Sequence, residues 1–130
     1  MYLGIDLGAK TTGLAISEGQ FASPYSTITH KSQKEAVEKI STIIKDQNIT
    51  EIVLGFVEGK IKTLFTSFAK ALKAKNPNIE IIMWDETLTS GQAKDYLIKL
   101  QVPQKKRAQK EHEVAASLIL QSYLDSNTKF

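Results

Sequence analysis

The chain has 130 residues, of which 42% are hydrophobic and 24% are charged, and its formal net charge at pH 7 is +3. We expect residues 1–130 to form a single domain with its own core. The absence of cysteine excludes disulfides, thiolate metal sites and cysteine nucleophiles. No apolar run is long enough to span a membrane and no basic leader is present, so we expect a cytoplasmic protein with no membrane partner.

The start of the chain predicts two strands joined by a tight turn. Residues 2–5 and 14–16 are apolar, and Gly8-Ala9-Lys10 lies between them, where glycine permits a left-handed backbone. Asp6 is the exception in this apolar stretch. Its carboxylate either caps the turn by accepting a backbone N–H or serves a functional site, because a buried charge needs a cationic partner.

A third strand and a helix follow. Residues 25–29 are rich in hydroxyl and β-branched side chains, which are typical of strands, and Pro24 marks a strand start or a sheet edge. Ser32 and Glu35 have the spacing of a capping box. With the apolar periodicity after them, they predict a helix over 32–47.

The second half of the chain alternates strands and helices. Two short apolar runs are typical of strands buried on both faces, and three stretches have helical periodicity. The polar, basic stretch 101–109 predicts a mobile loop. The expected strands are 51–57 and 79–84, and the expected helices are 61–75, 89–100 and 110–124.

This order of elements predicts an α/β fold. The three leading strands form an antiparallel meander, which needs only short turns. Each of the two later strands follows a helix, so both should join the sheet in parallel through right-handed crossovers. We therefore expect a five-stranded mixed sheet with helices on both faces.

Acidic residues follow three of the predicted strands. Ligands of such sheets bind beyond the carboxyl ends of the strands, so these acids should meet at one edge. Converging carboxylates repel one another unless a divalent cation lies among them, and oxygen ligands select Mg²⁺ or Mn²⁺. Two such ions can activate a water and stabilise the leaving oxygen in phosphodiester cleavage. The acids are Asp6, Glu58, Asp85 and Glu86, and the cluster Glu111-His112-Glu113 lies in the last predicted helix.

Each of these features also has a purely structural explanation. Glu111 and Glu113 favour the dipole of a helix start without any function. Asp85 and Glu86 are compatible with a solvated strand exit. The basic run Lys105–Arg107 is either a solvated loop or a segment that holds phosphates beside the metals.

Three motifs together resemble the YqgF/RuvX family, and the similarity spans nearly the whole chain. Ile5–Ser17 resembles its D-x-G-x-K/R-x-G-x-A-x-S opening, and Asp85–Ser90 resembles its D-E-R-x-T motif. Lys105–Arg107 with Glu113–Leu124 resembles its basic loop and A-A-x-x-I-L-x-x-Y-L helix. The resemblance implies an RNase H-like fold and a metal-dependent nuclease that matures the 5′ end of the 16S ribosomal RNA precursor. It also implies similarity to Holliday-junction resolvases.

The resemblance implies roles for individual residues. Asp6 matches the first catalytic acid, and Glu86 matches the acid of the second motif. The third acid of the family aligns with His112, so we expect Glu113 to supply the missing oxygen, with His112 contacting the scissile phosphate or moving a proton. The expected catalytic residues are Asp6, Glu86, Glu113 and His112, the expected ligands of Mg²⁺ or Mn²⁺ are Asp6, Glu86 and Glu113, and the expected nucleic-acid contacts are Lys10, Thr89, Lys105, Lys106 and Arg107.

Four functions fit these observations. We expect an RNA endonuclease whose partner is a structured RNA, the rRNA precursor. A DNA junction resolvase is the alternative, and it should be a dimer because it cuts two strands symmetrically. A non-catalytic nucleic-acid-binding module is a third, because His112 replaces an acid. A nucleotide-binding protein is the last, since Asp6–Thr12 also resembles a phosphate loop of the actin and sugar-kinase fold. The sequence leaves monomer and dimer open.

Overall fold

The structure, a computed structural model, describes residues 1–56, 62–85 and 104–127. Its centre is a five-stranded mixed sheet with the strand order β3-β2-β1-β4-β5. The strands are β1 (Tyr2–Leu7), β2 (Thr11–Ser17), β3 (Ala22–Thr29), β4 (Glu51–Phe56) and β5 (Glu80–Asp85). The helices are α1 (Gln33–Asp46), α2 (Lys62–Lys75) and α4 (Gln104–Asn127).

The pairing of the strands confirms the predicted topology. β1 pairs with β2, and β2 with β3, in antiparallel ladders. β4 pairs in parallel with β1, and β5 in parallel with β4. Pro24 lies in the edge strand β3, where a missing N–H breaks few ladder bonds. The three leading strands therefore form the expected meander, and the two later strands extend the sheet from the other side of β1.

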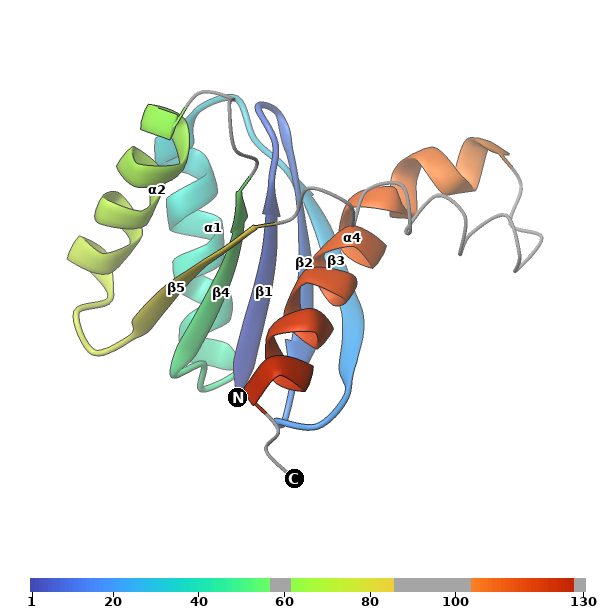
Figure 1. Cartoon of the computed structure of the whole chain (residues 1–130). Helices are drawn as coiled ribbons and strands as arrows, with labels where there is room; N and C mark the ends of the chain where they lie inside the picture. Colours follow the sequence, from blue (N-terminus) through green and yellow to red (C-terminus); the bar gives the residue numbers. More distant parts are fainter. Residues whose placement is uncertain (57–61, 86–103, 128–130) are drawn as a thin grey trace.

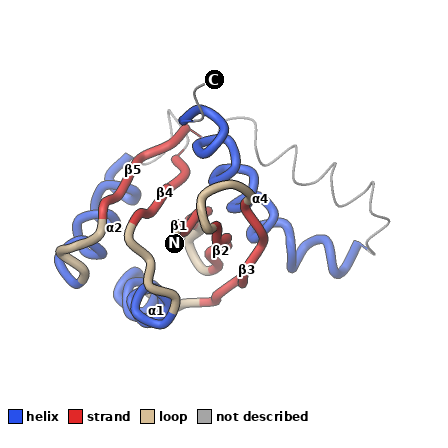
Figure 2. The backbone as a smooth tube through the Cα atoms, turned by 90° about the horizontal axis from the view of Figure 1, so that it is seen from below, coloured by secondary structure: helices blue, strands red, loops and turns tan. Residues whose placement is uncertain are grey.

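Helices cover both faces of the sheet, as predicted. Figures 1 and 2 show α1 and α2 on one face and α4 on the other. Side chains alternate between these faces along a strand. Leu3, Ile5 and Leu7 of β1 belong to the core shared with α1 and α2. Tyr2 packs in the core under α4. Every second side chain of a strand points to the same face, so Asp6 also faces α4.

The predicted cap of α1 by Ser32 is confirmed, while Glu35 reaches one residue further back than in a standard capping box. The backbone N–H of Glu35 donates to Ser32 Oγ at 3.2 Å, and the backbone N–H of Lys31 donates to Glu35 Oε2 at 3.0 Å. Ser32 thus satisfies a backbone donor that the helix itself leaves open, and Glu35 holds the residue that precedes the cap. α1 begins at the end of the sheet where β3 finishes, which is also the end where β1 carries Asp6.

The predicted loop over 101–109 is wrong for residues 104–109, because α4 begins at Gln104. Lysine, arginine, glutamine and alanine are all good helix formers, and proline, at position 103, is common next to a helix start. The basic composition that suggested a loop is equally typical of an exposed helical turn. The predicted helix over 89–100 lies outside the described residues. No helix in the described part of the chain is long and apolar enough to cross a membrane.

Candidate active site

Asp6 lies near the carboxyl end of β1, the central strand of the sheet. Its neighbours across the two ladders are Gly13 of β2 and Gly55 of β4. Neither neighbour places a side chain beside the carboxylate. Asp6 is nevertheless only 8% exposed, because α4 covers this face of the sheet. The bare backbone of Gly13 beside Asp6 leaves space that a helix can enter.

α4 enters this space on the β2 side. A Cβ atom at Gly13 would lie 2.0 Å from the carbonyl carbon and oxygen of His112, so only glycine permits this contact. The close approach brings His112 Nδ1 to 3.0 Å from Asp6 Oδ2. The side chain of His112 is 39% exposed and that of Asp6 is 11% exposed, so the imidazole lies on the solvent side of the carboxylate. The carboxylate of Asp6 therefore contacts α4 and does not cap the turn after β1.

The side chain of Glu113 points toward β3 and not toward Asp6. The hydroxyl of Thr27 donates a hydrogen bond to Glu113 Oε2 at 3.0 Å. Thr27 of β3 pairs with Gly13 of β2, which pairs with Asp6, so Thr27 lies two strands from Asp6. Two strand spacings are roughly 10 Å. The structure thus brings His112 to Asp6, and it gives Glu113 a separate neighbour on β3.

The other predicted site residues fall into three groups. Glu86 and Thr89 lie outside the described residues, as does Glu58. Lys10 is exposed in the turn between β1 and β2, at the same end of the sheet as Asp6. The backbone of Lys105–Arg107 belongs to the first turn of α4.

A divalent cation is compatible with Asp6 but needs further ligands. Asp6 offers carboxylate oxygens, which Mg²⁺ and Mn²⁺ prefer. Across residues 1–56, 62–85 and 104–127, no group of three histidine or acidic side chains is placed to hold a metal ion. A complete ligand set would therefore have to draw on a residue such as Glu86, which follows β5 directly in the sequence.

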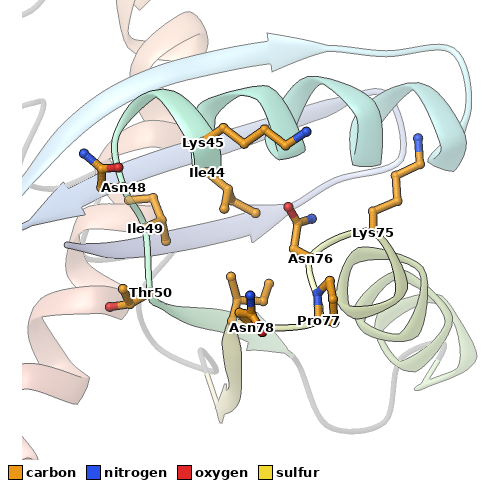
Figure 3. Close-up of a pocket in the computed structure, with 10 residues that line it drawn as sticks. Ile44, Lys45, Asn48, Ile49, Thr50, Lys75, Asn76, Pro77 and Asn78 are labelled. Atoms are coloured by element: carbon orange, nitrogen blue, oxygen red, sulfur yellow. The ribbon is translucent and has the colours of Figure 1, made fainter.

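A separate pocket lies at the opposite end of the sheet (Figure 3). Residues from the C-terminal ends of α1 and α2 and from the segments that lead into β4 and β5 line it, including Lys45 and Lys75. Its volume is about 490 Å³. Ligands of open α/β sheets bind at the carboxyl ends of parallel strands, and this pocket lies at their amino ends. We therefore assign the candidate active site to the edge that carries Asp6.

Two residues that shape this site, Gly13 and Thr27, are not among the predicted site residues. Gly13 allows α4 to approach β2, and Thr27 holds Glu113. A glycine inside a strand often marks the close approach of another backbone, so Gly13 carried a usable signal. Thr27 carried none, because threonine is common in strands for its propensity alone.

Comparison with known proteins identifies the family. A family model described as RuvX, Holliday junction resolvase, matches residues 1–126. A protein of Staphylococcus haemolyticus, provisionally named a pre-16S rRNA nuclease, is 36% identical over 134 residues, which cover 95% of this chain and 94% of that protein. A Clostridium botulinum protein with the same provisional name is 37% identical, with 98% of both chains covered.

Solved structures resemble the fold at low sequence identity. The Fowlpox virus resolvase in complex with Holliday junction DNA has a TM-score of 0.62 at 15% identity, covering 98% of this chain and 99% of that one. The Thermus thermophilus RuvC in complex with a Holliday junction has a TM-score of 0.59 at 13% identity, covering 98% and 96%. The fold is RNase H-like, as the sequence resemblance implied. Together with the match over residues 1–126, these similarities show that the chain belongs to the RuvX family of nucleases.

Proposed function

We propose that this protein is a divalent-metal-dependent nuclease that hydrolyses phosphodiester bonds at the sheet edge carrying Asp6. The observation that carries the proposal is a carboxylate that is 89% buried at the carboxyl end of the central strand, flanked by two glycines. A buried carboxylate is costly unless a cation or a donor meets it. His112 supplies one donor, and on the β4 side Gly55 places no side chain beside the carboxylate.

We propose Mg²⁺ or Mn²⁺ as the cofactor, with Asp6 and Glu86 as its ligands. Such an ion would polarise the scissile phosphate and activate a water. Glu113 could join the ligand set only if its carboxylate left the hydroxyl of Thr27. In this arrangement Asp6 would hold the ion on the central strand of the sheet, which would fix the position of the ion relative to a bound substrate.

His112 orients the Asp6 carboxylate. An ionised carboxylate only accepts hydrogen bonds, so the His112 nitrogen that lies 3.0 Å from Asp6 Oδ2 carries the proton. This bond ties one carboxylate oxygen to α4 and leaves the other oxygen for a cation. A hydrogen-bonded partner of this kind sets the direction of a ligand and raises its affinity for a metal.

We propose the 5′ region of the 16S rRNA precursor as the substrate and the cytoplasm as the place of action. The support is the shared provisional name of relatives that are more than one third identical over nearly their whole length. Lys10, exposed at the same sheet end as Asp6, would contact the RNA phosphates. With the proposed contacts of Thr89 and Lys105–Arg107, it would position the backbone without reading its sequence.

The variant Asp6→Asn tests the proposal. It keeps the shape of the side chain and removes the charge, so we expect RNA cleavage in Mg²⁺ to fall by more than about 100-fold, since loss of even an outer-shell partner costs 10- to 100-fold. RNA binding in excess chelator should persist. Asp46→Asn, in the exposed last turn of α1, is the matched control and should cleave normally. Full activity of Asp6→Asn, or cleavage by the unaltered protein in excess chelator, would refute the metal mechanism.

Cleavage of a four-way DNA junction is the second candidate function, because the matching family model carries that description. The same assay with precursor RNA and junction DNA in parallel separates the two. Preference for the junction, together with a dimer in solution, would favour a resolvase, since symmetric cutting of two strands needs two related sites. Preference for the RNA supports the proposed substrate. Binding of both without cleavage of either would leave the non-catalytic module.

A further inference from the structure

His30 is a buried polar residue on the face of the sheet opposite to Asp6. It follows β3 directly and is 6% exposed. Its Nε2 atom lies 2.8 Å from the hydroxyl oxygen of Thr12, which is fully buried. Thr12 pairs with Leu7, whose side chain belongs to the core under α1 and α2. The imidazole and the hydroxyl therefore meet behind the sheet edge that carries the candidate active site.

The same residue also binds the turn between β1 and β2. The backbone N–H of His30 donates to the carbonyl oxygen of Lys10 at 2.8 Å. His30 thus holds residue 10 through its backbone and residue 12 through its ring. This short segment carries Lys10, which is exposed at the end of the sheet where Asp6 lies, and it leads directly to Gly13 under α4.

A buried polar pair at this position has a cost that an apolar pair would avoid. An imidazole and a hydroxyl lose their hydration on burial, and their mutual hydrogen bond offsets only part of that loss, because His30 Nδ1 is buried with no hydrogen-bond partner among the described residues. A neutral imidazole has one donor and one acceptor, so it bonds the hydroxyl with either tautomer. A directional bond, unlike apolar packing, fixes the place of His30 relative to Thr12, and with it the place of the N–H that holds Lys10.

We propose that His30 is a positioning residue for nucleic-acid binding, which holds the Lys10–Thr12 segment so that Lys10 meets a substrate phosphate beside Asp6. This inference rests on the proposed function of Lys10 as a phosphate contact. Because the hydrogen bonds of His30 already order the segment, the segment loses less conformational entropy when RNA binds. The bond between His30 and Thr12 therefore raises the affinity for RNA although neither residue contacts the RNA.

We call the two hydrogen bonds of His30, from its ring to Thr12 and from its backbone to Lys10, the His30 clamp. Hydrogen exchange tests this clamp independently of nucleic-acid binding. Thr12→Val keeps the volume and removes the hydroxyl. The exchange of the His30 amide, which donates to Lys10, should accelerate by about three- to tenfold, the worth of one hydrogen bond. Thr50→Val, whose hydroxyl donates to the Met1 carbonyl at the other end of the sheet, should leave this amide unchanged. Unchanged exchange in Thr12→Val overturns the clamp. His30→Gln, which retains a polar group within reach of Thr12, is the second variant and should exchange more slowly than His30→Leu.

A double-mutant cycle on RNA affinity tests the action through Lys10. The probe is a fluorescent RNA hairpin in excess chelator, where no cleavage occurs. Lys10→Ala and Thr12→Val should each weaken binding, and the double variant should bind no more weakly than Lys10→Ala alone. Additive effects would mean that His30 acts elsewhere and would overturn the proposal. Normal affinity of Lys10→Ala would refute the phosphate contact itself, while the exchange experiment would still decide whether the clamp exists.

Discussion

His112 occupies the position where the family resemblance implies an aspartate. The contacts of His112 and of its neighbour Glu113 show which of the two lies closer to Asp6. It bonds Asp6, whereas Glu113 bonds Thr27 two strands away. The two adjacent residues diverge because successive positions on a helix are 100° apart and the helix axis passes over Gly13. A direct substitution of the missing acid by Glu113 would require its carboxylate to leave the hydroxyl of Thr27.

Metal titrations of cleavage separate the roles of these two residues. His112→Asp adds a carboxylate next to Asp6, so we expect the Mg²⁺ concentration for half-maximal cleavage to fall several-fold. Glu113→Gln should leave that concentration unchanged, because the carboxylate lies with Thr27. A higher midpoint in Glu113→Gln would instead show that Glu113 is a ligand, and Thr27→Val, which frees the carboxylate, should then lower the midpoint. If His112→Asp changes neither midpoint nor rate, His112 is outside the metal site.

Some site residues could be predicted from the sequence and others could not. Asp6 was a visible anomaly, a charge in an apolar strand, and the structure places it at the centre of the sheet. The clamp between His30 and Thr12 joins residues 18 positions apart and leaves no local pattern. Contacts of this kind depend on which faces meet in the folded molecule, and neither composition nor periodicity encodes that directly.

At the scale of the element, α4 is the helix that the sequence described least well. Its apolar second half was predicted from periodicity, and Ala116 and Leu120 do pack against the sheet at Gly4. Its first turns have no apolar stripe, so periodicity gave no signal there. Intrinsic propensity was the better guide for residues 104–109, because their residue types favour a helix even without an apolar stripe.

The helical start of α4 sharpens the expected role of Lys105, Lys106 and Arg107. The three residues occupy consecutive positions of one helical turn, and we expect one or two of them to contact phosphates. Replacing all three with alanine should weaken binding to unrelated RNA hairpins to the same extent. It should also flatten the plot of log affinity against log salt concentration, by slightly less than one unit of slope for each of about one to two lost phosphate contacts. The measurement is RNA affinity across a series of salt concentrations in excess chelator. An unchanged slope would assign this turn to solvent.

A charge-matched control accompanies the change in α4. Lys45, Lys70 and Lys75 lie on α1 and α2, away from the edge of Asp6, so their replacement by alanine should leave the slope nearly unaltered. Helix stability is not the cause of the expected effect. Basic residues in a first turn oppose the helix dipole, and alanine has the highest helix propensity, so the α4 variant should keep its helix.

At the scale of the molecule, the sheet was predictable and the path of α4 across it was not. The hairpins and the two crossovers limit the strand arrangements, and the structure has the mixed sheet that they allow. The path of α4 depends on Gly4 and Gly13, where a Cβ atom would collide with the helix backbone. The sequence alone does not show that these two glycines lie under one helix, because this depends on the register of the strands. These glycines turn a common fold into a site by bringing His112 to Asp6.

The stability of the whole molecule should depend on pH through His30. Burial lowers the pKa of His30 below its ordinary value of about 6.5; nearby Glu35 acts against this shift and Lys39 reinforces it. Above that value His30 is neutral in both the folded and the unfolded chain, so it adds no pH dependence. Below it, the unfolded chain takes up a proton that the folded chain does not. The free energy of unfolding should therefore fall as the pH falls, by at most about 1.4 kcal/mol per pH unit.

Urea unfolding at about pH 7 and about pH 5.5 measures this contribution, because the window begins at the ordinary histidine pKa and ends before most carboxylates titrate. The unaltered protein should lose stability between the two values, and His30→Gln should lose less. His112→Gln is the control, since it removes the other histidine of the chain, whose side chain is 39% exposed, and it should keep the loss. An equal loss in His30→Gln and in the unaltered protein would mean that His30 takes up its proton alike in both states. The bond to Thr12 would then tolerate a charged ring, and the acid sensitivity of the molecule would arise at its carboxylates.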